Sequence, residues 1–120
     1  MDRTTMRLMI VDDNPEFRDA AANLFRRQGC DVVAVAADSS EALRLAAETV
    51  PDVVLVDVDL GPESGFDLAQ QLSDDHRCTV VLISAAGEQE LADLVALSPA
   101  VAFIPKTELS AHRIGQVVGQ

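Results

Sequence analysis

Apolar residues gather in five short runs, each four or five residues long: Leu8–Val11, Val32–Ala36, Val53–Val56, Val80–Ile83 and Val101–Ile104. Runs of this length and β-branched content are typical of strands buried on both faces of a parallel sheet. Segments in which apolar residues recur at helical spacing follow each run. The pattern therefore predicts five strands that alternate with five helices.

The boundaries of the expected helices follow from proline, glycine and serine positions. The first helix follows Pro15 and ends at Gly29, the second begins near Ser39 and stops at Pro51, the third starts near Gly65, and the last two cover about 88–97 and 110–118. The side chains expected to face the core include Phe17, Ala21, Leu24 and Phe25 in the first helix, Ala42, Leu45 and Ala46 in the second, Phe66, Ala69 and Leu72 in the third, Leu91, Leu94 and Val95 in the fourth, and Ile114, Val117 and Val118 in the fifth.

Strictly alternating strands and helices predict an α/β fold with a parallel sheet and helices on both of its faces. Right-handed crossovers leave few topologies, and a chain of 120 residues fits a single domain. We expect a flavodoxin-like five-stranded sheet with strand order 2-1-3-4-5, formed by one domain that covers residues 1–120.

The net charge of −11, from 20 acidic and 9 basic residues, narrows the range of partners. A negative field repels nucleic acid and anionic membranes, so we expect no direct contact with either. No apolar run is long enough for a signal peptide or a membrane span, which indicates a cytoplasmic protein. Cys30 and Cys78 are expected to be reduced thiols, and His76 and His112 isolated surface histidines.

Polar residues follow the expected strands at the places where this fold binds ligands. In an open α/β sheet the ligand site lies beyond the carboxyl ends of the strands, where the strand order reverses. Asp12 and Asp13 follow the first strand, Asp57 and Asp59 the third, Ser84 the fourth, and Lys106, the sole lysine, the fifth. Each residue alone is most often a turn residue, a helix cap or a surface charge. Their convergence at one edge of the sheet indicates a site.

The residue types at this edge suit phosphoryl transfer. Neighbouring carboxylates repel each other, and Mg²⁺, which prefers oxygen ligands, would offset that repulsion. Asp57 is the candidate nucleophile. The Ser84 hydroxyl and the Lys106 ammonium could neutralise the phosphoryl oxygens by hydrogen bonds and charge.

Four segments resemble the motifs of response-regulator receiver domains, in the same order and at similar spacing. They are Leu8–Pro15, Pro51–Leu60 with Gly65 eight residues after Asp57, Val81–Ala85 and Ala102–Lys106. The resemblance covers almost the whole chain. It implies a phosphorylation-activated receiver of a two-component system, which is a signalling switch and not an enzyme with a free substrate.

The resemblance also implies a role for each site residue. Asp57 is the implied phosphoacceptor, and the implied Mg²⁺ ligands are Asp13, Asp12 largely through water, Asp57, and the backbone carbonyl of Asp59. Ser84 and Lys106 would bind the phosphoryl group. Ser84 and Phe103 would form the switch, in which Phe103 fills the space that the Ser84 side chain leaves.

Partners and output follow from the same resemblance. The phosphoryl donor would be a sensor histidine kinase or a phosphotransfer protein, and phosphorylation could also drive homodimerisation. The expected output surface comprises the helix at 88–97, the strand at 101–104 and the helix at 110–118.

Some positions depart from the family pattern, and two other functions stay open. Gly61 stands where the family often has proline, Thr107 follows Lys106 where a cis proline is usual, and Ala86 offers no polar side chain to the site. One alternative is a receiver-like interaction module that needs no phosphorylation. The other is an aspartyl-phosphate phosphatase, since Asp57-Val58-Asp59 resembles the nucleophile motif of the haloacid dehalogenase family.

Overall fold

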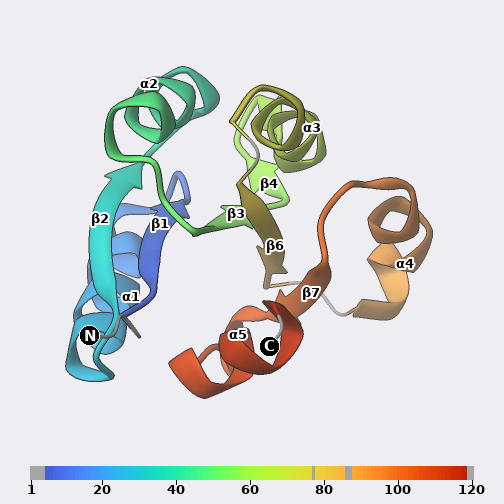
Figure 1. Ribbon diagram of the computed structural model, residues 1–120. Coiled ribbons are helices and arrows are strands. Elements are labelled where there is room, and N and C mark those ends of the chain that lie inside the picture. Colours follow the sequence, from blue (N-terminus) through green and yellow to red (C-terminus); the bar gives the residue numbers. More distant parts are fainter. Residues whose placement is uncertain (1–4, 77, 86–87, 119–120) are drawn as a thin grey trace.

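The computed structural model describes residues 5–76, 78–85 and 88–118, and for residues 76 and 88–91 it describes the backbone alone. Strands and helices alternate along the chain as expected (Figure 1). The elements are β1 Arg7–Val11, α1 Pro15–Arg27, β2 Asp31–Ala36, α2 Ser39–Thr49, β3 Val53–Asp57, β4 Asp59–Leu60, β5 Glu63–Ser64, α3 Gly65–His76, β6 Thr79–Ser84, α4 Glu88–Leu97, β7 Ala102–Pro105, the 3₁₀ turn η1 Lys106–Glu108 and α5 Ala111–Val118.

The main sheet has five parallel strands in the order β2-β1-β3-β6-β7. Counted along the chain within this sheet, the order is 2-1-3-4-5, so the expected flavodoxin-like topology is confirmed. Helices α1 and α5 pack on one face, and α2, α3 and α4 pack on the other (Figure 1). The order reverses between β1 and β3, which places a ligand site beyond the ends of these two strands.

Polar caps fix the starts of the first two helices. The Asn14 side chain accepts hydrogen bonds from the backbone N–H groups of Glu16 and Phe17 at 3.0 and 3.4 Å. Asp38 does the same for Glu41 at 2.9 Å. Each cap satisfies backbone donors that lack a partner within the helix. Helix α2 ends at Thr49, and the next residue, Val50, has a φ of 49°, in the left-handed region that favours glycine.

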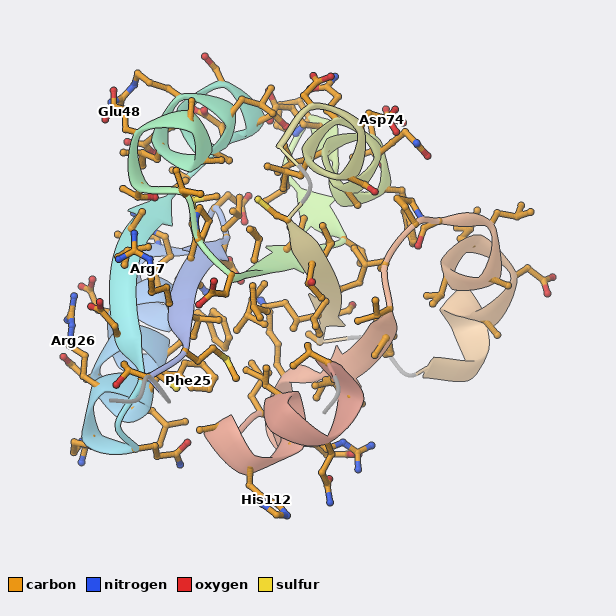
Figure 2. All side chains as sticks on the ribbon, viewed as in Figure 1. Arg7, Phe25, Arg26, Glu48, Asp74 and His112 are labelled. Carbon is orange, nitrogen blue, oxygen red and sulfur yellow. The ribbon has the colours of Figure 1, made fainter. Side chains whose placement is uncertain are left out.

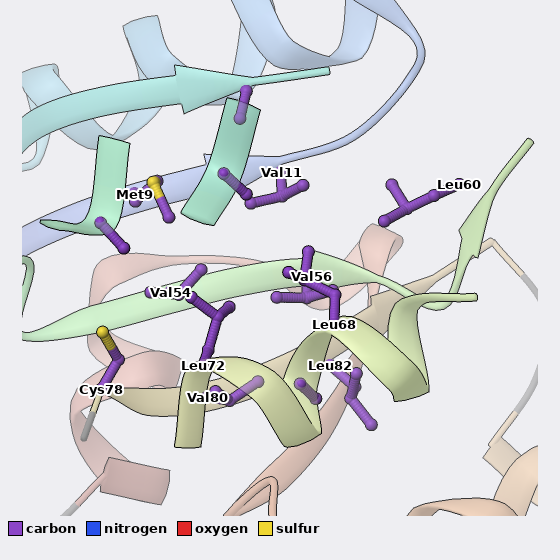
Figure 3. Close-up of a cluster of buried hydrophobic side chains, with 14 of the residues drawn as sticks. Met9, Val11, Val54, Val56, Leu60, Leu68, Leu72, Cys78, Val80 and Leu82 are labelled. Carbon is purple, nitrogen blue, oxygen red and sulfur yellow. The ribbon is translucent and has the colours of Figure 1, made fainter. Parts of the chain in front are cut away.

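Two apolar cores hold the layers together, one on each face of the sheet. Figure 3 shows the core under α2 and α3, where side chains of β1, β3 and β6 interlock with Leu68 and Leu72. The other core contains Phe25 of α1, labelled in Figure 2, and Ile114 of α5, both fully buried. All five residues of β3 are buried, as a central strand covered on both faces requires.

The orientation predicted for the fourth helix is partly wrong. Val95 packs against the core, but Leu94 is 51% exposed and Leu97 is 84% exposed. Apolar residues surround most of the circumference of α4, so their spacing does not select one inward face. The side chain of Leu91 lies outside the described residues. The last strand begins at Ala102, one residue later than expected, and Val101 before it is 54% exposed.

A short hairpin after β3 was not expected. Strands β4 and β5 pair in antiparallel fashion around Gly61, whose φ is 68°. The hairpin is tied to α2, because the Glu63 carboxylate accepts a hydrogen bond from the backbone N–H of Ser39 at 2.9 Å. Gly65 then starts α3 so close to β3 that a Cβ atom there would lie 2.0 Å from the backbone oxygen of Asp57. Glycine is therefore required at this position.

Three smaller expectations concern single residues. Cys78 is buried and Cys30 half-buried, and neither forms a disulfide, as expected. His112 is exposed on the outer side of α5 (Figure 2), whereas the side chain of His76 lies outside the described residues. In the part of the chain that is described no peptide bond is cis, so Lys106–Thr107 is trans.

Candidate functional site

Four parallel strands bring the expected polar residues to one edge of the sheet. Asp57 and Ser84 are the last residues of β3 and β6, while Asp12 and Lys106 directly follow β1 and β7. Together they border a cleft of about 500 Å³ whose lining residues are Asp12, Asp13, Asn14, Asp57, Val58, Asp59, Ser84, Ala85 and Lys106. The predicted convergence of these residues is confirmed.

Asp57 lies at the base of the cleft and is only 5% exposed. One of its carboxylate oxygens accepts a hydrogen bond from the backbone N–H of Asp59 at 3.1 Å, and the other accepts one from Lys106 Nζ at 3.1 Å. Burial, with a contribution from the charge of Asp12, raises the pKa of Asp57 from 3.8 to about 6, although the Asp59 N–H and Lys106 oppose the rise. The carboxylate is thus held in a fixed orientation and is ionised at neutral pH.

Asp12 is fully buried and held at three atoms. Its Oδ1 accepts a hydrogen bond from the Asn14 N–H at 2.9 Å, and its backbone oxygen accepts one from Arg18 Nη1 at 2.7 Å. Its Oδ2 forms an ion pair with Lys106 Nζ at 2.7 Å. A buried carboxylate needs such partners, because burying an unpaired charge is costly.

Lys106 places its ammonium between the two buried carboxylates. Burial acts to lower its pKa, but the hydrogen bonds and charges of Asp12 and Asp57 outweigh burial and raise the pKa above its ordinary value. The ammonium therefore stays charged at neutral pH. On another side, Nζ lies 4.2 Å from the centroid of the Phe17 ring, within the range of a cation–π interaction.

The carboxylates form a cluster that suits a hard divalent cation. Oxygen atoms of Asp12, Asp13 and Asp57 lie within 4.8 Å of one another, and Asp13 is exposed to incoming ions. Three carboxylates face a single ammonium, so negative charge remains for a metal ion to neutralise. The donor set consists of oxygens, which Mg²⁺ prefers. Asp59 borders the cleft, but its carboxylate does not belong to this cluster.

Ser84 and Phe103 lie on the β6–β7 side of the site. Ser84 is 4% exposed and borders the same cleft as Asp57. Phe103 is buried in the core that lies under α2, α3 and α4. Its burial suits an ordinary core residue as well as a switch residue, so the switch role stays a prediction. Ala86 lies outside the described residues.

Sequence reasoning missed three residues that support the site. Asn14 and Arg18 hold Asp12, and Phe17 contacts Lys106, although Phe17 was expected only as a core residue of the first helix. Gly61 is a fourth neighbour, because a Cβ atom there would lie 3.2 Å from Asp13 Oδ2. The sequence carried one usable signal, namely that the first turn of α1 directly follows Asp12 and Asp13.

Comparison with known proteins identifies the family. The family model of the response regulator receiver domain matches residues 8–117. The chain belongs to this family. Receiver domains of response regulators are phosphorylation-activated switches of two-component signalling, and they interact with histidine kinases or phosphotransfer proteins. This membership favours neither the phosphatase nor the phosphorylation-independent module.

Individual relatives agree with this assignment. The transcriptional regulatory protein PdtaR of Mycobacterium tuberculosis is 28% identical over 92% of this chain, which spans 59% of the length of PdtaR. The chemotaxis protein CheY of Listeria monocytogenes is 33% identical over 70% of this chain and 71% of its own length. The BeF₃-activated receiver domain of Klebsiella pneumoniae RstA superposes with a TM-score of 0.83 at 26% identity, over 95% of this chain and 99% of that domain.

None of the helices in the described part of the chain has the length and apolar character needed to cross a bilayer.

Proposed function

We propose that this chain accepts a phosphoryl group on Asp57, in a Mg²⁺-dependent reaction, from the phosphohistidine of a sensor histidine kinase or a phosphotransfer protein. The observation that carries the proposal is the position of Asp57. Its carboxylate lies at the base of an open cleft, within 4.8 Å of Asp12 and Asp13 oxygens and 3.1 Å from the Lys106 ammonium. We treat residues 1–120 as one such receiver domain.

The transfer of the phosphoryl group needs a nucleophilic oxygen that is held in the right orientation toward the phosphorus. An Asp57 carboxylate oxygen attacks the phosphorus, the P–N bond of the phosphohistidine breaks, and the imidazole leaves with the electron pair of that bond. The Asp59 N–H and Lys106 hold the carboxylate while the donor approaches. Since no free substrate is turned over, the chain acts as a switch and catalyses only its own phosphorylation and dephosphorylation.

The acidic cluster is the proposed Mg²⁺ site. Asp13 and Asp57 would contribute carboxylate oxygens, Asp12 would act largely through water, and Asp59 would contribute its backbone carbonyl. When bound, Mg²⁺ supplies positive charge that offsets the charge of the phosphoryl oxygens. With the carboxylates engaged by the metal ion, the Lys106 ammonium would be available to the phosphoryl group.

Ser84 and Lys106 are the proposed phosphate-binding residues, and Ser84 with Phe103 the proposed switch. A hydroxyl that turns toward the phosphoryl group on Asp57 leaves space that the Phe103 ring can occupy. Ser84→Ala should therefore permit phosphorylation while it uncouples the response of α4 and β7. Lys106→Ala should slow phosphorylation and block the active conformation, with little effect on folding.

The proposed output surface is formed by α4, β7 and α5. Leu94, Leu97 and Val101 expose apolar side chains on or beside these elements, as a surface for protein partners requires. A phosphorylation-dependent homodimer is one expected use of this surface. The charge of −11 argues against direct binding to nucleic acid or to an anionic membrane. We propose that the protein works in the cytoplasm with its kinase.

Intact-mass spectrometry tests the acceptor. Incubation with Mg²⁺ and a small phosphodonor such as acetyl phosphate should add one phosphoryl group to the wild-type chain and none to Asp57→Asn. Asp75→Asn, an exposed residue of α3, removes the same charge far from the cleft and should label normally. Labelling of Asp57→Asn at the wild-type rate would refute the proposal.

A further inference from the structure

We propose that Phe17 is a positioning residue for Lys106, and that its aromatic ring is needed for efficient phosphorylation. The observation is that Lys106 Nζ lies 4.2 Å from the centroid of the Phe17 ring. The inference rests on the proposed function, because it assigns Lys106 to the phosphoryl group. It goes beyond that function by adding a residue of α1 to the machinery of the site.

The ring and the two buried carboxylates confine the ammonium together. Nζ lies 2.7 Å from Asp12 Oδ2 and 3.1 Å from Asp57 Oδ2, and the face of the Phe17 ring carries partial negative charge toward the same atom. Three groups, from the loop after β1, from β3 and from α1, thus hold one cation.

The start of α1 places the ring there. Asn14 caps the helix and accepts a hydrogen bond from the Phe17 N–H at 3.4 Å, which holds Phe17 in the first turn. The next residue, Arg18, donates to the backbone oxygen of Asp12 at 2.7 Å. The first turn of α1 is therefore anchored to the strand end that carries Asp12, and the ring has a defined position relative to the site.

An apolar cavity beside the lysine makes the ring important. It has a volume of about 130 Å³ and is bordered by Phe17, Ala20, Ala21, Leu24, Phe25, Lys106 and Leu109. Without the ring, the ammonium would lose its attractive contact on the side that faces this cavity, and the lysine stem would have room to move. The ammonium could then move away from the carboxylates, and the fraction of molecules with Lys106 in place would fall. General cation–π energies correspond to a loss of about 2- to 30-fold.

The alternative is that Phe17 only fills space between α1 and the turn after β7. Under that alternative, any apolar side chain that preserves folding would preserve phosphorylation. Under the proposal, the aromatic ring itself is required. Phe17→Leu and Phe17→Met, which keep apolar bulk but lose the ring, therefore distinguish the two, and Phe17→Tyr, which keeps the ring, should restore the wild-type rate.

The sole lysine of the chain allows the contact to be measured directly. In a protein labelled with ¹³C and ¹⁵N at lysine, one set of side-chain NMR signals reports Lys106. The ring current of Phe17 should shift the Lys106 Hε signals upfield, and the shift should disappear in Phe17→Leu and Phe17→Met. Wild-type Hε signals without a ring-current shift would overturn the inference.

Two measurements complete the test: the rate of phosphorylation by acetyl phosphate, and the affinity for beryllofluoride, an acyl-phosphate mimic. Phe17→Leu and Phe17→Met should each lose about 2- to 30-fold in both quantities. Leu24→Ala, which enlarges the same cavity without touching the ammonium, should keep wild-type values. Wild-type values in the two ring-free variants would overturn the inference alone. Absence of labelling in the wild type would instead overturn the proposed function.

Discussion

Helices α1 and α4 pack on opposite faces of the same sheet, but they are attached to it very differently. Helix α1 buries Ala21, Ala22 and Phe25 in the core. Helix α4, in its described side chains, packs only Val95 partly against the core and leaves Leu94 and Leu97 exposed. A segment with few buried apolar contacts has low local stability and can move without unfolding the rest.

The two helices also differ in their connection to the site. The first turn of α1 reaches it through Arg18 and Phe17, and its last turn is followed by Gln28, which accepts a hydrogen bond from the Ala111 N–H of α5 at 2.6 Å. Helix α1 therefore holds the site in place. None of the described side chains of α4, residues 92–97, borders the cleft, which suits the proposed place of this helix in the output surface.

The largest effect on stability is expected for a substitution on the side of α1 that faces the core. Phe25→Ala removes a fully buried ring and should lower the free energy of unfolding by about 3–5 kcal/mol. Urea denaturation followed by circular dichroism measures the change. A loss below about 1 kcal/mol, the ordinary effect of a substitution, would contradict the description of α1 as the firmly attached helix.

Mg²⁺ should stabilise the side of the molecule that α1 anchors. At roughly 100 times its Kd, a ligand that binds only the native state adds about 2.7 kcal/mol to the free energy of unfolding. Asp13→Asn should raise the stability of the metal-free protein, because it removes one of three repelling carboxylates, and should weaken the response to Mg²⁺. Melting curves with Mg²⁺ and with EDTA measure both. An Asp13→Asn protein that responds like the wild type would refute the ligand role.

The stability of the metal-free protein should also depend on pH. Burial raises the pKa of Asp57 to about 6 in the folded chain, whereas unfolding returns it to about 3.8. Between these values the native state binds more protons than the unfolded state, so the contribution of Asp57 to stability grows as the pH falls through this window and is lost as it rises above about 6. The difference is on the order of 3 kcal/mol.

The control for the pH effect is Asp57→Asn, which cannot titrate at this position. In EDTA, the stability of the wild type relative to Asp57→Asn should increase between pH 7 and pH 5. A relative stability that stays constant over this range would show that the carboxyl is not desolvated as described.

The smallest effect on stability is expected on α4. Leu97→Ala should change the free energy of unfolding by less than about 0.5 kcal/mol, because the side chain is 84% exposed. The same substitution should weaken phosphorylation-dependent association, measured by sedimentation-velocity ultracentrifugation of the beryllofluoride-treated protein. Val35→Ala, on the strand at the opposite edge of the sheet, is the matched control and should leave association unchanged. Equal effects of both substitutions would remove α4 from the output surface.

Much of this fold could be predicted because its signals are local. A buried parallel strand must be apolar along its whole length, and the five runs read from the sequence became the five strands of the sheet. The positions of the site residues followed from the same rule, since Asp12, Asp57, Ser84 and Lys106 stand where strands end. The order of the strands and the edge of the sheet that carries the site could therefore be predicted from the sequence.

Tertiary structure decided the features that depend on contacts between distant segments. The exposed face of α4 was not predictable, because apolar residues surround the helix and only its position over the sheet selects Val95. The hairpin at Asp59–Ser64 depends on Gly61 and on Glu63, which reaches the start of α2. The contact between Phe17 and Lys106 joins residues far apart in sequence. Residue type and periodicity thus determined which side chains are buried and where strands end, whereas the packing of helices on the sheet decided which of those side chains meet.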